Sequence, residues 1–364
     1  MVDRQQLLSA VTTIVNVIGA RAEQIGLVCD GYTFTVQGWC KRQRYGRATF
    51  PAGGVRPFDA VLPSDRLRQL LSTTEGEQLE ISSTNVKGQK CIVLKNQSSR
   101  FTLSTTGEIA DMPPIQEVEA VAEFTMATSE LARSLMYALP LSNEDSARFA
   151  FSGVHISIGE RVMFHGTDGR RLLRHCRTPL SHSGEPIAHV VPREMVRAVV
   201  TALKADKSRT VRARMTHTVT QFFTDTLMLG AANVEGRYPN TDEIIKAAGE
   251  GFVQEIAIGN LVHMVRLGAT ILETDAAGMV FSVNKDSITG EIQVPSACCH
   301  VEMTDGQRHG EVRTTLDVRY LRECLSMFDP NATVRWYQKD GDSAAFFHLP
   351  DDVIYVQMPI TVEG

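Results

Sequence analysis

The sequence predicts an α+β protein that contains three copies of one unit. Six amphipathic helix candidates form two alternating series, whose members recur roughly every 125 to 130 residues. Stretches rich in β-branched and aromatic residues, such as 211–223 and 344–360, lie between the helices. Each unit also ends on an aromatic residue or a methionine followed by proline, at Met112-Pro113, Tyr238-Pro239 and Met358-Pro359.

The helices of the first series begin near Asp3, Thr128 and Ile258, where apolar residues start to recur at helical spacing. Those of the second series begin at Pro63, Pro192 and Asp317, and proline or aspartate suits a first helical turn with unsatisfied amide groups. The six predicted helices span residues 3–17, 63–71, 128–139, 192–204, 258–270 and 317–328.

Length and composition favour a globular protein of more than one domain. The chain has 364 residues, of which 43% are hydrophobic, and its net charge is -5, which excludes a disordered tail and a basic DNA coat. Proline-rich and glycine-rich linkers suggest domains at residues 1–118, 119–247 and 248–364. No apolar run is long enough to span a bilayer, and the N-terminus lacks a signal-peptide pattern, so we expect a cytoplasmic protein without membrane contact.

Positive charge gathers on the predicted helices, which together carry +4 on a chain of net charge -5. In the fourth helix Arg193, Arg197 and Lys204 lie within about 40° of one another around the axis. The opposite face should be buried, and it consists of Met195, Val196, Val199, Val200 and Leu203. The basic stripe is either an ordinary solvated face or a surface that contacts phosphates without reading a sequence.

Catalytic motifs are missing from the sequence: it has no nucleotide-binding glycine loop, no nucleophile elbow and no zinc-protease helix. Cys298, Cys299 and His300 are adjacent, and adjacent residues of a strand point to opposite faces, so they cannot easily converge on one metal ion. The prediction is therefore a protein with no enzymatic activity, no metal and no cofactor. A β-rich hydrolase is a distant alternative.

Several motifs, in this order and spacing, resemble those of the bacterial DNA polymerase III β subunit, the DNA sliding clamp, over nearly the whole chain. The most specific is 166–172, GTDGRRL, which is similar to the T-D-G-x-R-L motif of the middle clamp domain. The other matches are RFAFSG at 148–153, EGRYPN at 235–240, SRFTLST at 99–105 and YVQMPI at 355–360.

The resemblance implies three repeated clamp domains per chain, in a ring that a head-to-tail homodimer closes, with helices lining the inside and sheets outside. Phe101 and Leu103 of one chain would meet Ile271 and Leu272 of the other, although ordinary core packing would also explain these residues. The DNA-facing residues would be Arg21, Arg148, Arg193, Arg197 and Lys204. The implied partners are double-stranded DNA, the DNA polymerase III α subunit, the clamp loader and other clamp-binding replication and repair proteins.

The resemblance also implies a groove that binds short peptides of these partners through apolar anchors. Its expected residues are Phe151, Thr167, Gly169, Arg170, Arg171, Leu172, Pro239, Ile244, Val356, Met358, Pro359 and Ile360. Taken alone, the turn at 167–169 could be an ordinary hairpin turn. The main alternative function is that of a diverged clamp paralogue, which would bind peptides through the same groove without encircling DNA.

Overall fold

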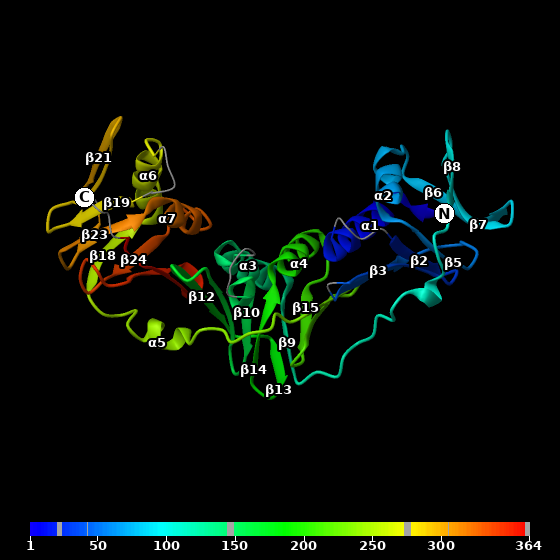
Figure 1. Cartoon of the computed structure of the whole chain (residues 1–364), viewed down its shortest axis with the longest axis horizontal. Coiled ribbons are helices and arrows are strands. Elements are labelled where there is room, and N and C mark those ends of the chain that lie inside the picture. The colour runs from blue at the N-terminus through cyan, green and yellow to red at the C-terminus, as the bar shows by residue number, and fades with distance from the viewer. Residues whose placement is uncertain (20–23, 42, 144–148, 273–277, 305, 361–364) are drawn as a thin grey trace. The chain divides into compact units, whose positions relative to one another are not determined.

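The structure is a computed structural model that describes residues 1–19, 24–41, 43–143, 149–272, 278–304 and 306–360 (Figure 1). Its contacts divide the chain into two compact units. The first unit consists of Met1–Arg133, Ile158–Glu160 and Pro179–Val234, and the second of Ser134–Ser157, Arg161–Thr178 and Glu235–Gly364. No helix in the described ranges is both long and apolar enough to cross a membrane.

All six predicted helices are present, and each begins within one residue of its predicted start. They are α1 (Arg4–Ile18), α2 (Ser64–Thr73), α3 (Thr128–Ala138), α4 (Arg193–Ala205), α6 (Ile258–Ala269) and α7 (Val318–Leu325). Two starts are capped by side chains, since Asp3 accepts a hydrogen bond from the Gln6 amide and Asp317 accepts one from the Arg319 amide. The prediction was wrong at the end of α7, which stops at Leu325 rather than at residue 328.

Short helical segments were not predicted, because they are too brief to show a helical period. They are α5 (Thr241–Lys246) and four 3₁₀ turns: η1 (Ile109–Asp111), η2 (Leu139–Leu141), η3 (Phe149–Phe151) and η4 (Pro350–Asp352). α5 and η2 belong to the second unit, where both lie near the candidate site.

Two antiparallel sheets belong to the first unit (Figure 1). In sheet order, the smaller consists of β1 (Val2–Asp3), β6 (Gln78–Val86), β7 (Gln89–Lys95) and β8 (Arg100–Ser104). The larger consists of β13 (Ser181–Gly184), β9 (Ala122–Ala127), β15 (Thr210–Met215), β16 (Val219–Phe223), β17 (Leu227–Ala232), β4 (Arg44–Pro51), β3 (Thr33–Cys40), β2 (Gln24–Cys29) and β5 (Phe58–Pro63). A further strand, β14 (Ile187–Pro192), leads directly into α4.

The second unit also contains two antiparallel sheets. In order, the larger includes β10 (Gly153–Ile158), β11 (Val162–Thr167), β12 (Arg171–Arg177), β26 (Val353–Gln357), β25 (Ala345–Leu349), β24 (Thr333–Tyr337), β18 (Phe252–Ala257) and β22 (Gln307–Arg308). The smaller consists of β21 (Ala297–Met303), β20 (Ile288–Val294), β19 (Gly278–Val283) and β23 (Val312–Asp317). Trp336, Phe347 and Tyr355 of the larger sheet share one buried core with residues of α6 and α7.

The strand order repeats three times along the chain. A three-stranded meander follows the first helix of each predicted unit: β2-β3-β4, β10-β11-β12 and β19-β20-β21. A second meander follows the other helix: β6-β7-β8, β15-β16-β17 and β24-β25-β26. The predicted α+β fold with three copies of one arrangement is therefore confirmed.

Two strand pairs join successive copies. β4 pairs with β17, and we call this pair the first seam; β12 pairs with β26, and we call this pair the second seam. In both seams the last strand of a first meander meets the last strand of the second meander in the next copy. Among the described residues, the two remaining strands of this kind, β21 and β8, lie at sheet edges.

Candidate functional site

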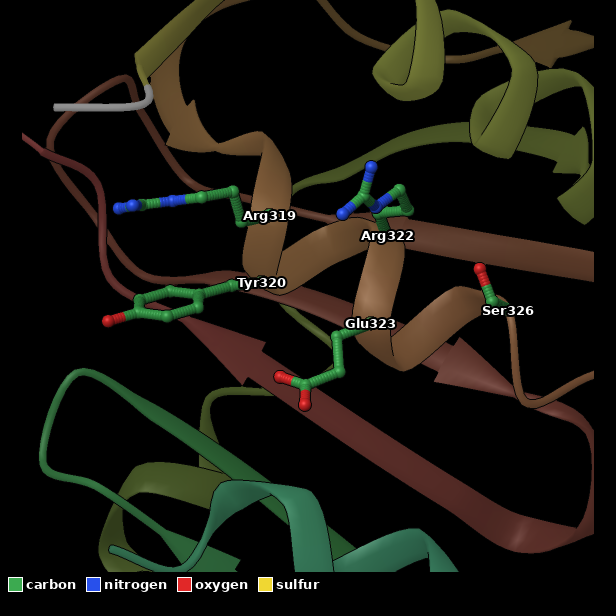
Figure 2. Close-up of a pocket in the computed structure, with 5 residues that line it drawn as sticks. All are labelled: Arg319, Tyr320, Arg322, Glu323 and Ser326. Carbon is green, nitrogen blue, oxygen red and sulfur yellow. The ribbon is translucent and has the colours of Figure 1, made fainter. Parts of the chain in front are cut away.

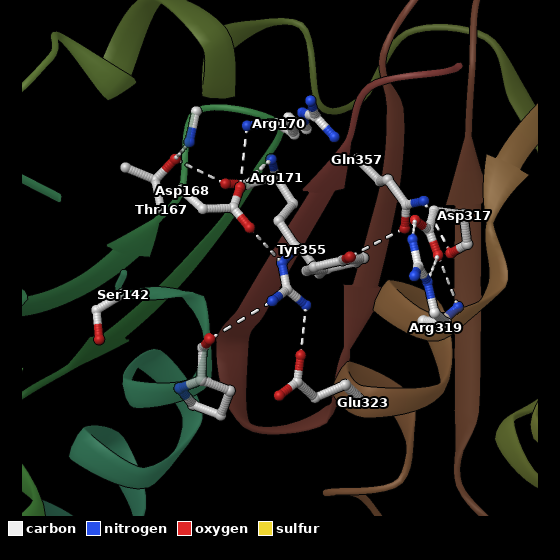
Figure 3. A network of polar contacts seen from close by, with 12 residues as sticks. Ser142, Thr167, Asp168, Arg170, Arg171, Asp317, Arg319, Glu323, Tyr355 and Gln357 are labelled. Atoms are coloured by element: carbon white, nitrogen blue, oxygen red, sulfur yellow. Dashed lines mark hydrogen bonds and ion pairs between the residues drawn. The ribbon is translucent and has the colours of Figure 1, made fainter. Parts of the chain in front are cut away.

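The turn between β11 and β12 is fixed by its own side chains. The Thr167 hydroxyl donates to the Arg171 carbonyl at 2.7 Å and accepts from the Gly169 amide at 3.1 Å. One oxygen of Asp168 accepts from the amides of Arg170 and Arg171, at 3.0 and 3.1 Å (Figure 3). Threonine and aspartate stabilise such turns because their short side chains reach nearby amides. The motif is therefore a rigid turn that sets where β12 begins.

Glycine is required at position 169 for two reasons. Its φ is +90°, a conformation that residues with a side chain rarely adopt. A Cβ atom added there would lie 3.2 Å from the ring of Phe151, which is buried. Three residues of the predicted groove, Phe151, Thr167 and Gly169, therefore meet at this turn.

An apolar cluster lies across the second seam, and we call it the seam cluster. Leu172 of β12 stands directly opposite Val356 of β26, and both side chains are buried. The full cluster consists of Leu172, Ile245, Ala248, Phe346, Ile354 and Val356. These residues come from three segments that are far apart in the sequence, so the fold assembles this surface.

Large apolar side chains remain exposed beside the seam cluster. Met358 is 48% exposed and donates its amide hydrogen to the Arg170 carbonyl at 3.0 Å, which extends the strand pairing. Because alternate residues of an extended chain share a face, Met358 lies on the same face as Val356. Exposed apolar residues next to a buried apolar cluster are typical of surfaces that bind a partner.

The remaining predicted groove residues are placed less uniformly. Pro239 is exposed, while Pro359 and Ile360 are half-buried, and the Ile360 amide donates to the Thr315 carbonyl at 2.9 Å. Ile244 is 43% exposed, and its neighbour Ile245 is the residue that packs into the seam cluster. Ile245 was missed because the short helix α5 gives no period from which its buried face could be predicted.

The side chain of Arg171 lies on the opposite face of β12 from that of Leu172, and it is not part of the seam cluster. Its side chain is 7% exposed, and its guanidinium pairs with Asp168 at 2.9 Å and with Glu323 of α7 at 2.7 Å (Figure 3). It also donates to the Pro140 carbonyl at 3.4 Å and stacks 4.1 Å from the ring centre of Tyr320. Burial lowers the pKa of Arg171, but Tyr355, Glu323 and Asp168 outweigh burial, so its pKa lies above that of free arginine.

An open depression of about 540 Å³ lies on the exposed face of α7 (Figure 2). Its lining consists of Arg319, Tyr320, Arg322, Glu323 and Ser326. Asp317 binds the Arg319 guanidinium at 2.9 Å, and its carbonyl accepts a hydrogen bond from Gln357 of β26 at 3.0 Å. The hydrogen bond between Gln357 and Asp317 therefore links the start of α7 to the second seam. No local sequence motif predicts this contact.

An aromatic stack fixes the segment that precedes α5. The ring of Tyr238 lies parallel to that of His155 at 4.1 Å between centroids, and His155 stacks on His165 at 5.4 Å. Burial, together with the smaller effects of the nearby His155 and Arg174, lowers the pKa of His165 to about 3. The neutral His165 ring also lies 3.5 Å from the hydroxyl of Thr241, the first residue of α5. This stack holds the segment that contains Pro239 and leads into α5, and no sequence pattern predicts it.

Three of the five predicted DNA-facing residues belong to α4. Arg197 and Lys204 are exposed and Arg193 is half-buried, while the apolar residues predicted for the opposite face are all buried. The amphipathic pattern of α4 is therefore confirmed. The other two residues, Arg21 and Arg148, lie outside the described residues.

The four residues predicted for the chain-to-chain contact occupy two different places. Phe101 and Leu103 are half-buried and alternate with exposed residues on the edge strand β8 of the first unit. Ile271 and Leu272 follow α6 in the second unit, where they are half-buried against its core. Each pair therefore combines partial burial with a position near an edge of a sheet or the end of a helix.

Comparison with protein families and with curated proteins gave no match. Solved structures match the chain over its full length. The sliding clamp of Pseudomonas aeruginosa bound to griselimycin is 20% identical and has a TM-score of 0.89, with 99% of this chain and 98% of that chain covered. The DNA polymerase III β subunit of Thermotoga maritima is 15% identical, with a TM-score of 0.87 and coverage of 100% and 99%. The sliding clamp of Bacillus subtilis is 14% identical, with a TM-score of 0.88 and coverage of 100% and 98%. The chain therefore has the sliding-clamp fold.

Proposed function

We propose that this protein is a DNA sliding clamp of the DNA polymerase III β subunit family. Two chains would form a ring around duplex DNA and tether the replicative polymerase, without catalysing a reaction. The proposal extends to three domains, at residues 1–118, 119–247 and 248–364, and to a cytoplasmic location. It rests on the full-length fold match, together with the motif series of the sequence.

The observation that carries the proposal is the repeated seam. Two seams join the three copies within the chain, and the strands that would form a third seam, β21 and β8, are edge strands. Exposed strand edges tend to pair with another chain. Because β21 and β8 belong to different copies, a second chain would pair β21 with β8 twice, and such a head-to-tail contact can close a ring.

The apolar surface at the second seam is the proposed peptide site. Leu172 and Val356 would form its floor, while Met358, Pro359 and Pro239 would border it. A flexible methionine suits a surface that accepts several partners. The proposed partners are the DNA polymerase III α subunit, the clamp loader and other clamp-binding proteins.

Retention on DNA tests the ring. Once loaded on nicked circular duplex, the protein should remain bound through gel filtration at physiological salt, and linearising the DNA should release it within minutes. Equal retention on both forms would contradict encirclement. Retention on neither form, with peptide binding intact, would favour the paralogue that binds peptides alone.

The DNA-facing surface can be tested on the same substrates. Replacing Arg193, Arg197 and Lys204 with glutamine should weaken direct DNA binding and lower the salt slope by about one unit for each lost phosphate contact. An unchanged salt slope would place α4 away from DNA.

A further inference from the structure

We propose that Arg171 and Glu323 form an ion-pair clip that positions the peptide site without contacting the peptide. The inference rests on the proposed function, because it assigns a role in peptide binding to two residues outside the seam cluster. By sequence Arg171 was expected to line the groove, but its side chain lies on the helix-facing side of β12.

The clip joins three elements of the second unit. Arg171 begins β12, Glu323 belongs to α7, and the Pro140 carbonyl belongs to η2. The planar guanidinium forms these contacts in different directions (Figure 3). It also stacks on the ring of Tyr320. A flat, forked cation can satisfy all of these partners at once, whereas a lysine ammonium cannot.

The residues next to Arg171 form the proposed peptide site. The preceding residue, Arg170, accepts the hydrogen bond of the Met358 amide, and the following residue, Leu172, faces Val356. A shift of Arg171 would therefore move both the exposed rim and the buried floor of the site. Sites of this kind need supporting contacts that hold the binding residues in place.

Glu323 is the partner that can be removed with the least damage to the fold. Its side chain is 47% exposed at the depression on α7, whereas the Arg171 side chain is 7% exposed. Without Glu323, Arg171 would still pair with Asp168 at 2.9 Å, so the buried cation would not lose every partner. Truncation of Glu323 thus loosens the link to α7 and retains the turn.

The first seam provides a matched ion pair. Arg44 begins β4, as Arg171 begins β12, and its side chain is also 7% exposed. It pairs with Glu194 of α4, which is the second helix of the next copy, as α7 is for Arg171. Glu194 is 38% exposed, close to the value for Glu323. The same chemistry therefore occurs at a seam where no peptide site is proposed.

The test measures binding of a fluorescein-labelled peptide that copies the clamp-binding segment of the same organism's polymerase III α subunit. Glu323→Ala should weaken binding about tenfold, mainly through faster dissociation, because one charged hydrogen bond is lost from the support of the site. Glu323→Gln keeps an acceptor oxygen and should restore part of the affinity. The matched control Glu194→Ala should bind within about twofold of the unmodified protein.

Three outcomes separate the hypotheses. If the unmodified protein does not bind the peptide, the proposed function fails. If it binds and Glu323→Ala binds equally well, only the clip is refuted. If Glu194→Ala loses as much affinity as Glu323→Ala, the effect is general loosening, and the clip is refuted as well. Should Glu323→Ala fail to fold, Glu323→Gln and Glu323→Asp are compared by the same criterion, since unchanged binding in both also refutes the clip.

Discussion

The two seams share one pattern of backbone pairing. They differ in what covers the sheet face opposite the helices. At the first seam Tyr45 stands opposite Gly230, and a Cβ atom added to this glycine would lie 2.4 Å from the tyrosine ring. Gln221 donates to the Tyr45 hydroxyl at 2.7 Å and to the Gln116 carbonyl at 2.8 Å, and it accepts from the Val118 amide. The hydrogen bonds of Gln221 therefore hold the linker around residues 116–118 against this seam.

In the part of the chain that the structure describes, no comparable set of hydrogen bonds holds a linker over the second seam. Its linker contributes Ile245 and Ala248 to the seam cluster, but Met358 stays 48% exposed. The comparison shows that a repeated backbone arrangement does not by itself make a binding site. The site depends on how each linker crosses the seam and on how much apolar surface it leaves open.

The largest expected effect concerns the third seam, which is proposed to form between chains. The double substitution Ile271→Ala and Leu272→Ala should convert a dimer into a folded monomer. Each such side chain contributes roughly 1.5 to 3 kcal/mol when buried, so the dimer dissociation constant should rise by orders of magnitude. Sedimentation velocity over a range of concentrations measures this change.

Leu267→Ala is the control for that experiment, because Leu267 lies in the last turn of α6 and is 36% exposed. It should leave the dimer intact. An unfolded product of the double substitution would instead assign Ile271 and Leu272 to the core of the second unit.

A smaller effect is expected at the open rim of the second seam. Met358→Ala, combined with removal of the residues after Pro359, should weaken peptide binding by about 2 kcal/mol, as for a central apolar anchor. A peptide titration and a sizing run on the same variant provide the measurement. Leu180→Ala, at a side chain that is 67% exposed in the first unit, is the control. Normal peptide affinity would refute the site, and joint loss of the dimer would make the C-terminal segment structural.

The smallest effect, taken per pH unit, is a pH dependence of stability that is expected from the aromatic stack of the second unit. His165 has a pKa of about 3 in the folded chain, because burial disfavours its charged form, and about 6.5 when unfolded. The unfolded chain therefore binds more protons between these values, so the stability that neutral His165 contributes is complete above pH 6.5. It falls by up to about 1.4 kcal/mol per pH unit as the solution is acidified towards pH 3.

Urea unfolding of the unmodified protein and of His165→Gln at several pH values measures the contribution of His165 to the free energy of unfolding. The variant should lose stability less steeply than the unmodified protein within that window. Parallel pH profiles would show that His165 does not carry the effect and would direct attention to His175, whose pKa burial and Arg177 lower to about 4.

Helices were predictable because their signals are local. Proline or aspartate at positions 63, 192 and 317 predicted the starts of three helices, and the spacing of apolar residues predicted the starts of the other three. The side-chain direction of Arg171 was not predictable in this way, because it depends on which face of β12 packs against α7. The stack of His155 on Tyr238 was not predictable either, because the two residues are far apart in the sequence and no regular spacing relates them.

At the proposed peptide site, too, some residues were predictable from sequence motifs and others only from the fold. Leu172, Val356 and Met358 could be selected from motifs, and the structure brings Leu172 and Val356 into one cluster. Ile245, Phe346 and Ile354 could not, because their place in the cluster follows from the pairing of β12, β26 and β25 and from the position of α5. Strand pairing is a property of the whole fold, and a short helix has no period to reveal its buried face.

The surroundings of Arg171 also limit which substitutions the chain can accept there. Lysine would keep the positive charge but would lose the forked geometry that reaches Asp168, Glu323 and the Pro140 carbonyl together. Glutamine or leucine would leave Asp168, whose side chain is 13% exposed, without its cation. Related sequences should therefore accept almost nothing but arginine at position 171.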